Sequence, residues 1–109
     1  MKRKLIIMRH AKSSWNNAHL SDHERPLNGR GRRSAPQVAQ QLSAGNHQPE
    51  IIFSSDSTRT TETWLLMQDE LDHLPATYLR ELYLGGLEDI KAVVEPVAAE
   101  IQTVMVLGH

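Results

Sequence analysis

The residues best suited to chemistry follow a short apolar run near the start of the chain. Arg9 and His10 come directly after Leu5–Met8, a run that predicts a strand buried on both faces. A guanidinium offers a planar fork for phosphate oxygens, and a neutral imidazole is a good nucleophile near neutral pH. Taken alone the pair is a weak signal. A phosphate site is predicted only if other residues of the chain lie close to Arg9 and His10 in the fold.

Two later strands of the predicted fold also end in polar side chains. Glu50–Phe53 leads into a Ser-Ser pair with Arg59 a turn later, and Thr103–Leu107 leads into Gly-His109. Strands that alternate with helices predict a three-layer α/β/α fold with a mostly parallel sheet. Ligands of such sheets bind beyond the carboxyl ends of the strands. We therefore expect the three polar strand ends to converge on one site.

The elements between these strands can be outlined from the spacing of apolar residues. Residues 9–27 lack periodicity and predict a long loop, which in a compact domain is often functional. Helical spacing runs from Asn28 to a stop at Gly45, although Pro36 requires either a kink or a regular part that begins near Ser34. The remaining elements are a polar turn over Ser54–Ser57, a helix that carries Trp64, Leu65, Met67 and Leu71, a short strand over Thr77–Leu79, and a helix over Leu87–Val97 that contains an awkward Pro96.

The composition excludes several classes of function. The 109 residues predict a single domain over 1–109, and 12 basic against 13 acidic residues do not indicate binding to nucleic acid or to a membrane. The chain has no cysteine, which excludes disulfide and thiolate chemistry and is compatible with a cytoplasmic location. The first apolar run is too short for a signal peptide. We expect a soluble, monomeric, cytoplasmic domain.

Four segments of the chain, one of them R-E-L-Y-L-G-G around Glu81, together resemble the histidine phosphatase superfamily, which has the phosphoglycerate mutase-like fold. The stretch R-H-A-K-S-S-W-N from Arg9 is similar to the family's R-H-G-x-T-x-W-N and looks like the SixA-type phosphohistidine phosphatase branch. Ser55, Arg59 and Thr63 match its S-x-x-x-R-x-x-x-T segment, and V-M-V-L-G-H resembles the strand that delivers a second histidine. Family members continue for roughly another strand–helix–strand, so we expect this chain to be incomplete at its C-terminal end relative to the family.

This resemblance implies a role for each matching residue. His10 would be the nucleophile that carries the phosphoryl group, and Arg9, Arg59 and a protonated His109 would bind its oxygens. Ser13 and Asn16 would add neutral hydrogen bonds, or they could be simple turn formers. Glu81 stands where the family has its candidate proton donor, or it could be a solvated charge. We interpret Trp15 as a packing residue.

Two other patterns do not predict a site of their own. His19 and His23 are four residues apart but lie in the loop without a third ligand, so we expect no metal and no cofactor. The stretch N-G-R-G-R-R follows no strand and lacks the spacing of a phosphate-binding loop. We interpret Asn28 as a helix cap, and the arginines after it as a basic rim that could face an acidic partner: Arg30, Arg32 and Arg33.

The spacing of the motifs bears on the substrate. Only 21 residues separate Arg59 from Glu81 and 27 separate Glu81 from His109, which leaves little room for a lid. An open cleft suits a phosphoryl group presented by another protein, and an imidazole leaving group needs less acid catalysis than an alkoxide. The first hypothesis is a phosphohistidine phosphatase in signal transduction, acting on a histidine phosphotransfer-type domain. The alternatives are a phosphatase for small phosphoesters and a phosphoprotein-binding module without turnover.

Overall fold

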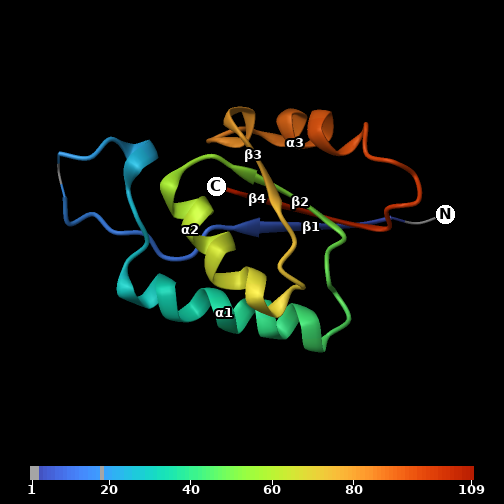
Figure 1. The fold of residues 1–109 in the computed structure, drawn as a ribbon. Coiled ribbons are helices and arrows are strands. Elements are labelled where there is room, and N and C mark those ends of the chain that lie inside the picture. Colours follow the sequence, from blue (N-terminus) through green and yellow to red (C-terminus); the bar gives the residue numbers. More distant parts are fainter. Residues whose placement is uncertain (1–2, 18) are drawn as a thin grey trace.

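Parallel strands form the central sheet of the protein. A computed structural model describes residues 3–17 and 19–109. The strands of these residues are β1 (Lys4–Arg9), β2 (Ile51–Ser55), β3 (Ala76–Leu79) and β4 (Thr103–Gly108). They lie in the order β1-β4-β2-β3, and every neighbouring pair is parallel (Figure 1). The predicted parallel sheet is thus confirmed.

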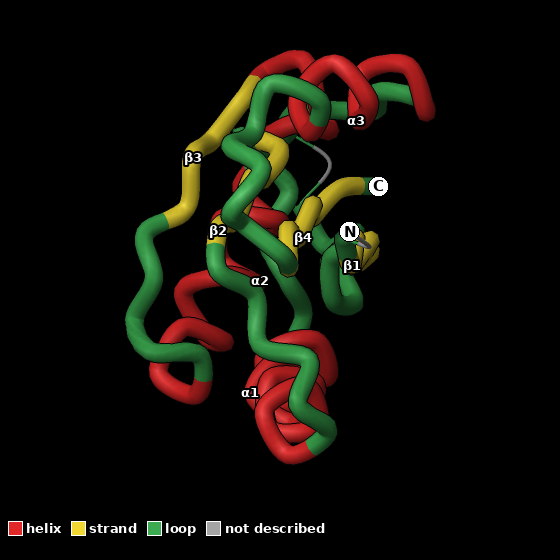
Figure 2. Tube along the Cα trace, turned by 90° about the vertical axis from the view of Figure 1, so that its right-hand side faces the viewer, coloured by secondary structure: helices red, strands yellow, loops and turns green. Residues whose placement is uncertain are grey.

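Helices lie on both faces of this sheet. α1 (Gly29–Ala44) and α2 (Thr58–Met67) pack together on one face, whereas α3 (Leu87–Val94) lies on the other (Figure 1, Figure 2). The side chain of Asn28 caps α1 by accepting a backbone N–H at 2.8 Å, and Ser57 caps α2 in the same way. The three-layer fold and the cap at Asn28 are both confirmed.

The hydrophobic core fills the space between the sheet and the layer of α1 and α2. The indole N–H of Trp64 also donates to the carbonyl of Leu74 at 3.0 Å, so this large ring is buried without an unpaired donor. Each fully buried apolar side chain contributes about 1.5–3 kcal/mol, which makes this layer the main support of the sheet. The buried cluster consists of Ala35, Ala39, Ile52, Trp64, Met67, Leu71, Met105 and Leu107.

The prediction that the first strand is buried on both faces is wrong. Ile6 and Met8 pack against the core, but Leu5 is 41% exposed and Ile7 is 57% exposed. β1 is an edge strand here, and α3 does not cover its outer face, which therefore remains open to solvent (Figure 2).

Pro36 does not delay the start of α1. The helix is regular from Gly29, so the alternative that it begins near Ser34 is wrong. The Asn28 cap and the complete burial of Ala35 and Ala39 hold the turns on either side of the proline. Packing outweighs the local cost of one missing backbone hydrogen bond.

Two other boundaries differ from the sequence expectation. β2 extends through Ser55, so the predicted polar turn is shortened to Asp56 and Ser57. α3 ends at Val94 rather than Val97, since Pro96 cannot continue the helix. As predicted, the segment after β1 is a long loop; it contains one 3-10 turn, η1 (Asp22–Glu24). Two further 3-10 turns lie later in the chain: η2 (Gln68–Glu70) and η3 (Arg80–Leu82).

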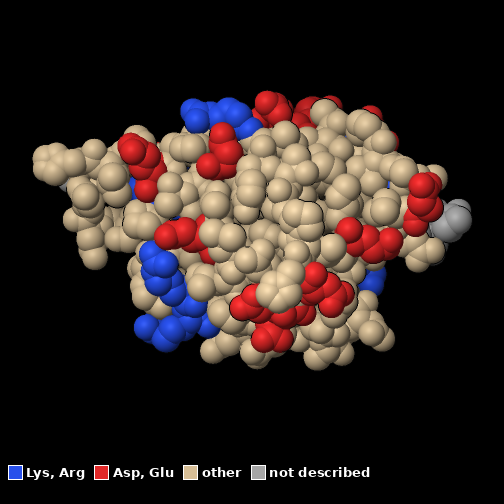
Figure 3. Space-filling model, in the orientation of Figure 1, with Lys and Arg blue, Asp and Glu red and all other residues tan. Residues whose placement is uncertain are grey.

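The charged surface has one feature that bears on function. Lys and Arg side chains gather over the N-terminal part of α1 (Figure 3), where the sequence places Arg30, Arg32 and Arg33. Arg32 forms an ion pair with Glu62 of α2 at 3.0 Å. None of the helices in residues 3–17 and 19–109 combines the length and apolarity that a membrane span requires.

Candidate active site

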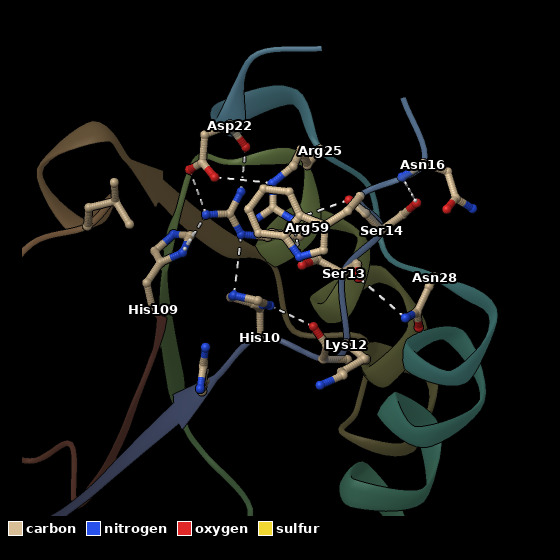
Figure 4. A pocket seen from close by; sticks show the side chains of 14 residues that line it. His10, Lys12, Ser13, Ser14, Asn16, Asp22, Arg25, Asn28, Arg59 and His109 are labelled. Carbon is tan, nitrogen blue, oxygen red and sulfur yellow. Dashed lines mark hydrogen bonds and ion pairs between the residues drawn. The ribbon is translucent and has the colours of Figure 1, made fainter. Parts of the chain in front are cut away.

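The polar ends of β1, β2 and β4 meet at one edge of the sheet, as the sequence predicted. Arg9 pairs in register with Gly108, and the N–H of His10 donates to the Gly108 carbonyl at 3.1 Å. Arg59 enters from the first turn of α2, directly after β2. The side chains of His10, Arg59 and His109 point toward one another (Figure 4).

The ring of His10 is held in the tautomer that a nucleophile needs. Its Nδ1 lies 2.6 Å from the carbonyl oxygen of Ala11, which can only accept, so Nδ1 carries the proton. Nε2 therefore keeps its lone pair, and it lies 3.3 Å from Nε of Arg59. Burial, and then the nearby arginines Arg59 and Arg9, lower the pKa of His10 below its usual 6.5, although the bond to Ala11 acts in the opposite direction. At neutral pH the ring is uncharged.

Arg59 connects the two histidines. It is 2% exposed, and its Nη2 lies 3.2 Å from Nδ1 of His109. A guanidinium can only donate, so Nδ1 of His109 must accept and the proton of that ring lies on Nε2. Arg59 also forms an ion pair with the carboxylate of Asp22 at 2.9 Å and donates to the backbone carbonyl of the same residue.

His109 is fixed as a neutral ring. Its Nε2 donates to the hydroxyl of Ser55 at 2.9 Å. Burial, followed by the charge of Arg59, lowers the pKa of His109 to about 4. From the sequence we expect a protonated His109 that donates to the phosphoryl group. That charged form requires a nearby negative group, such as the phosphoryl group itself, to raise the pKa of His109.

Asp22 and Arg25 are site residues that sequence reasoning missed. Asp22 accepts from Nε of Arg25 at 3.1 Å in addition to Arg59 (Figure 4). It also accepts from Tyr83 Oη at 2.6 Å. The Tyr83 hydrogen bond and the two arginines hold the pKa of Asp22 well below its usual range. The sequence feature that could have identified these two residues is an acid and a base three positions apart in a long loop that was already expected to be functional.

Arg25 fastens the loop after His10. It is 7% exposed, and its Nη1 donates to the hydroxyl of Ser13 at 3.0 Å and to the carbonyl of Ser14 at 3.2 Å. Its guanidinium carbon lies 3.4 Å from the ring centre of Trp15. The hydroxyl of Ser13 still has its own proton to donate.

Gly31 lets α1 approach this loop closely. A Cβ at Gly31 would collide with the carbonyl oxygen of Lys12, and the backbone N–H of Asn28 donates to that same oxygen at 2.9 Å. Gly31 is therefore needed for the packing of α1 against the backbone of Lys12. It sets the distance between α1 and the loop that follows the nucleophile.

These side chains line an open cavity of about 820 Å³. Basic side chains outnumber acidic ones along the described lining, where Asp22 is the one carboxylate. Asn16 and Ser13 lie in the lining as predicted, but Glu81 does not: it is exposed in η3. The interpretation of Trp15 as a packing residue is wrong, because it lines the cavity and is 76% exposed. The charged and histidine lining residues are Arg9, His10, Lys12, Asp22, Arg25, Arg59 and His109.

No metal-ligand cluster is present among the described residues, since nowhere do three or more His, Cys, Asp or Glu side chains gather. The ring of His23 instead lies in hydrogen-bond contact with Asp56, with 2.7 Å between Nε2 and Oδ1. Nothing in the cavity lining favours a cofactor over an oxyanion, whereas four basic side chains favour the oxyanion.

Comparison with known proteins agrees with this geometry. The family model of the histidine phosphatase superfamily (branch 1) matches residues 5–102. An Arabidopsis thaliana protein, described as uncharacterized and chloroplastic, is 37% identical over 98% of this chain. The chain spans 54% of that relative's length.

Two solved structures are also similar to this chain. One, from Agrobacterium tumefaciens and provisionally named a phosphohistidine phosphatase SixA, has a TM-score of 0.89 at 27% identity and covers all of this chain and 70% of its own. The other, a protein histidine phosphatase SixA complexed with tungstate, has a TM-score of 0.84 at 28% identity and covers 96% of this chain and 68% of its own.

Proposed function

Because the chain belongs to the histidine phosphatase superfamily and to its SixA-type branch, we propose that it is a phosphatase that removes the phosphoryl group of a phosphohistidine on a protein partner. One observation carries the proposal: the Ala11 carbonyl fixes the proton of His10 on Nδ1, so Nε2 keeps its lone pair in a basic cavity, where Arg59 Nε donates to it at 3.3 Å. The similar SixA structure is complexed with tungstate, an oxyanion, which supports oxyanion binding by this chain.

The proposed reaction has two displacements at phosphorus. Once Arg59 Nε turns its hydrogen bond from Nε2 of His10 to a phosphoryl oxygen, the Nε2 lone pair forms a bond to phosphorus while the P–N bond of the substrate breaks. The released imidazole takes up a proton from solvent water. Water then attacks the phosphorus of phospho-His10, its oxygen replaces Nε2, and inorganic phosphate leaves with the histidine restored. No oxidant or other co-reactant is needed.

The positive groups would stabilise the charge that spreads over the phosphoryl oxygens. Arg59 lies against Nε2 of His10, so a phosphoryl group that reaches this nitrogen also reaches a guanidinium. In this proposal Arg9 and His109 supply further contacts, and Ser13 and Asn16 complete the binding with neutral hydrogen bonds. The Asp22 carboxylate keeps the Arg59 guanidinium from turning away.

The cavity lining bears on which leaving group the substrate carries. Among the described lining residues no carboxyl group is held protonated to serve as a proton donor, because the pKa of Asp22 is lowered and Glu81 lies outside the lining. An imidazole departs readily once protonated, whereas an alkoxide needs a strong acid as it leaves. This contrast supports a P–N bond over an alkyl ester. The proton-donor role of Glu81 would require its side chain to move toward the cavity.

The surface around the cavity supports a protein substrate. The cavity is open, and the arginines of the basic rim (Arg30, Arg32 and Arg33) lie on the helix whose cap, Asn28, is part of the cavity lining. We include in the proposal an acidic surface on a histidine phosphotransfer-type domain, a role in signal transduction and a cytoplasmic location. A monomer as the working unit is part of the same proposal.

The test compares a phosphohistidine-bearing protein with a simple aryl phosphate and an alkyl phosphate. We expect kcat/KM to be highest for the phosphohistidine protein and lowest for the alkyl ester. A preference for a small phosphoester would indicate a small-molecule phosphatase. Tight binding of the phosphoprotein without release of phosphate would indicate a binding module, and either result contradicts the proposal.

A further inference from the structure

Trp15 is exposed at a place where an exposed indole is unusual. It is 76% exposed, yet it lines the same cavity as His10 and Arg59. Large aromatic side chains are normally buried, so an indole that remains open beside a reactive site has no packing function there.

The backbone around Trp15 is held in place. Ser13 forms an isolated bridge with Leu27, and the N–H of Ser14 donates to the carbonyl of Pro26 at 2.8 Å. Arg25 bonds the hydroxyl of Ser13 and the carbonyl of Ser14 from the other side. The indole is thus presented by an anchored loop, so little ordering is needed when a ligand binds.

One face of the indole is already occupied. The guanidinium carbon of Arg25 lies 3.4 Å from the ring centre, and Arg25 is itself held by Asp22 at 3.1 Å. A planar cation on a ring face fixes the tilt of that ring. The high exposure of the side chain shows that the opposite side of the ring is open to a second flat group.

We propose that Trp15, supported by Arg25, is a stacking platform for the planar ring of the leaving group. The inference deepens the proposed function and rests on it, because the ring that phosphohistidine presents is an imidazole. The platform would position that ring while its phosphoryl group approaches His10. It would select planar heteroaromatic and aryl leaving groups over amine or alkyl groups of similar reactivity.

The first experiment uses two substrates that share a P–N bond but differ in the ring. Phosphoimidazole carries the ring, and phosphoramidate does not. We expect Trp15→Ala to lower kcat/KM for phosphoimidazole about tenfold, near the upper end of what an aromatic pair contributes, mainly through KM. Phosphoramidate should change less than about twofold, and Trp15→Phe should retain most of the preference.

Leu65→Ala is the matched control, because Leu65 is also an exposed apolar side chain but lies on α2 outside the cavity lining. It should change neither substrate. Equal losses for both substrates in Trp15→Ala would show that Trp15 only supports the loop, and no loss for either would show that it binds nothing. Both results overturn the platform.

A binding measurement separates this inference from the proposed function. The phosphonates phenylphosphonate and methylphosphonate differ by a ring and cannot be hydrolysed. We expect the wild type to bind phenylphosphonate more tightly, and Trp15→Ala to lose that difference. If phosphohistidine is not hydrolysed but the ring preference persists, the proposed function fails and the platform stands. If phosphohistidine is hydrolysed without a ring preference, the platform alone fails.

Discussion

The ends of β1 and β4 lie side by side and each leads into a histidine, but the two rings carry their protons on opposite nitrogens. A backbone carbonyl accepts from Nδ1 of His10, whereas a serine hydroxyl accepts from Nε2 of His109 and a guanidinium donates to its Nδ1. The first arrangement puts the ring's lone pair on Nε2, to which Arg59 Nε donates at 3.3 Å, whereas the second puts it on Nδ1 and directs the Nε2 proton to Ser55. The difference shows that the partner of each ring, more than its position on a strand, determines the chemistry available to it.

The largest effect should separate the two histidines. His10→Ala should abolish both turnover and the acid-labile phosphoryl label left by brief exposure to a labelled substrate, because no other nucleophile replaces Nε2. His109→Ala should slow labelling by roughly 10²-fold and still leave the label on His10, as loss of one hydrogen-bond donor does. Mass spectrometry of the acid-sensitive adduct measures both. Labelling that persists in His10→Ala would contradict the assignment.

Arg59 contacts the rings of His10 and His109, so its replacement tests whether both histidines depend on the same guanidinium group. Arg59→Ala should lower kcat by ~10²-fold or more. Arg59→Lys should recover only part of the loss, because an ammonium cannot reach His10, His109 and Asp22 together. Steady-state kinetics measure the effect, with Arg3→Lys, at an exposed arginine outside the cavity lining, as the control. A fully active Arg59→Lys would show that charge alone is sufficient.

Acid titration should sharpen the comparison. The pKa values of His10 and His109 are both lowered in the folded protein, so each ring binds its proton more readily in the unfolded chain. Their contribution to the free energy of unfolding is therefore complete above pH 6.5 and is lost as the pH falls through that value toward the folded pKa, which is about 4 for His109. Histidine NMR titration, assigned with His10→Ala and His109→Ala, should place both midpoints below 6.5. A midpoint above 6.5 for either ring would contradict the geometry.

The smallest effect should come from Glu81, which follows neither β1 nor β4. Glu81→Gln should change kcat/KM for phosphohistidine by less than about threefold, since the imidazole leaving group needs little acid catalysis. Glu70→Gln, another exposed acid, is the control for surface charge. A loss of ~10²-fold, in the range of general acid catalysis, would mean that Glu81 moves into the cavity during turnover.

The parts of the site on regular elements were predictable from the sequence. His10, Arg59 and His109 follow strands, and the parallel sheet that the alternating pattern predicts brings such positions together. Asp22 and Arg25 were not predictable in the same way, because their partners are set by the path of a loop without periodicity. Trp15 was misinterpreted for a related reason: nothing in local spacing shows which side of a loop faces solvent.

The fold shows the same division. The order of strands and helices follows from apolar periodicity, and the cap at Asn28 follows from residue type. The exposure of Leu5 and Ile7 does not, because burial of an edge strand depends on what lies over it rather than on its own residues. Pro36 shows that a local rule about helix starts can yield to tertiary packing.

The pairing of β1 with β4 also has a consequence for the order of events during folding. Arg9 and Gly108 are register partners although 99 positions separate them along the chain. Contacts at such long sequence separation form slowly, because a large loop must close before they stabilise anything. β1 has no other strand partner in the described sheet, so it has no place to dock until β4 has been synthesised. During translation the proposed nucleophile would thus remain unreactive until β4 emerges and pairs with β1.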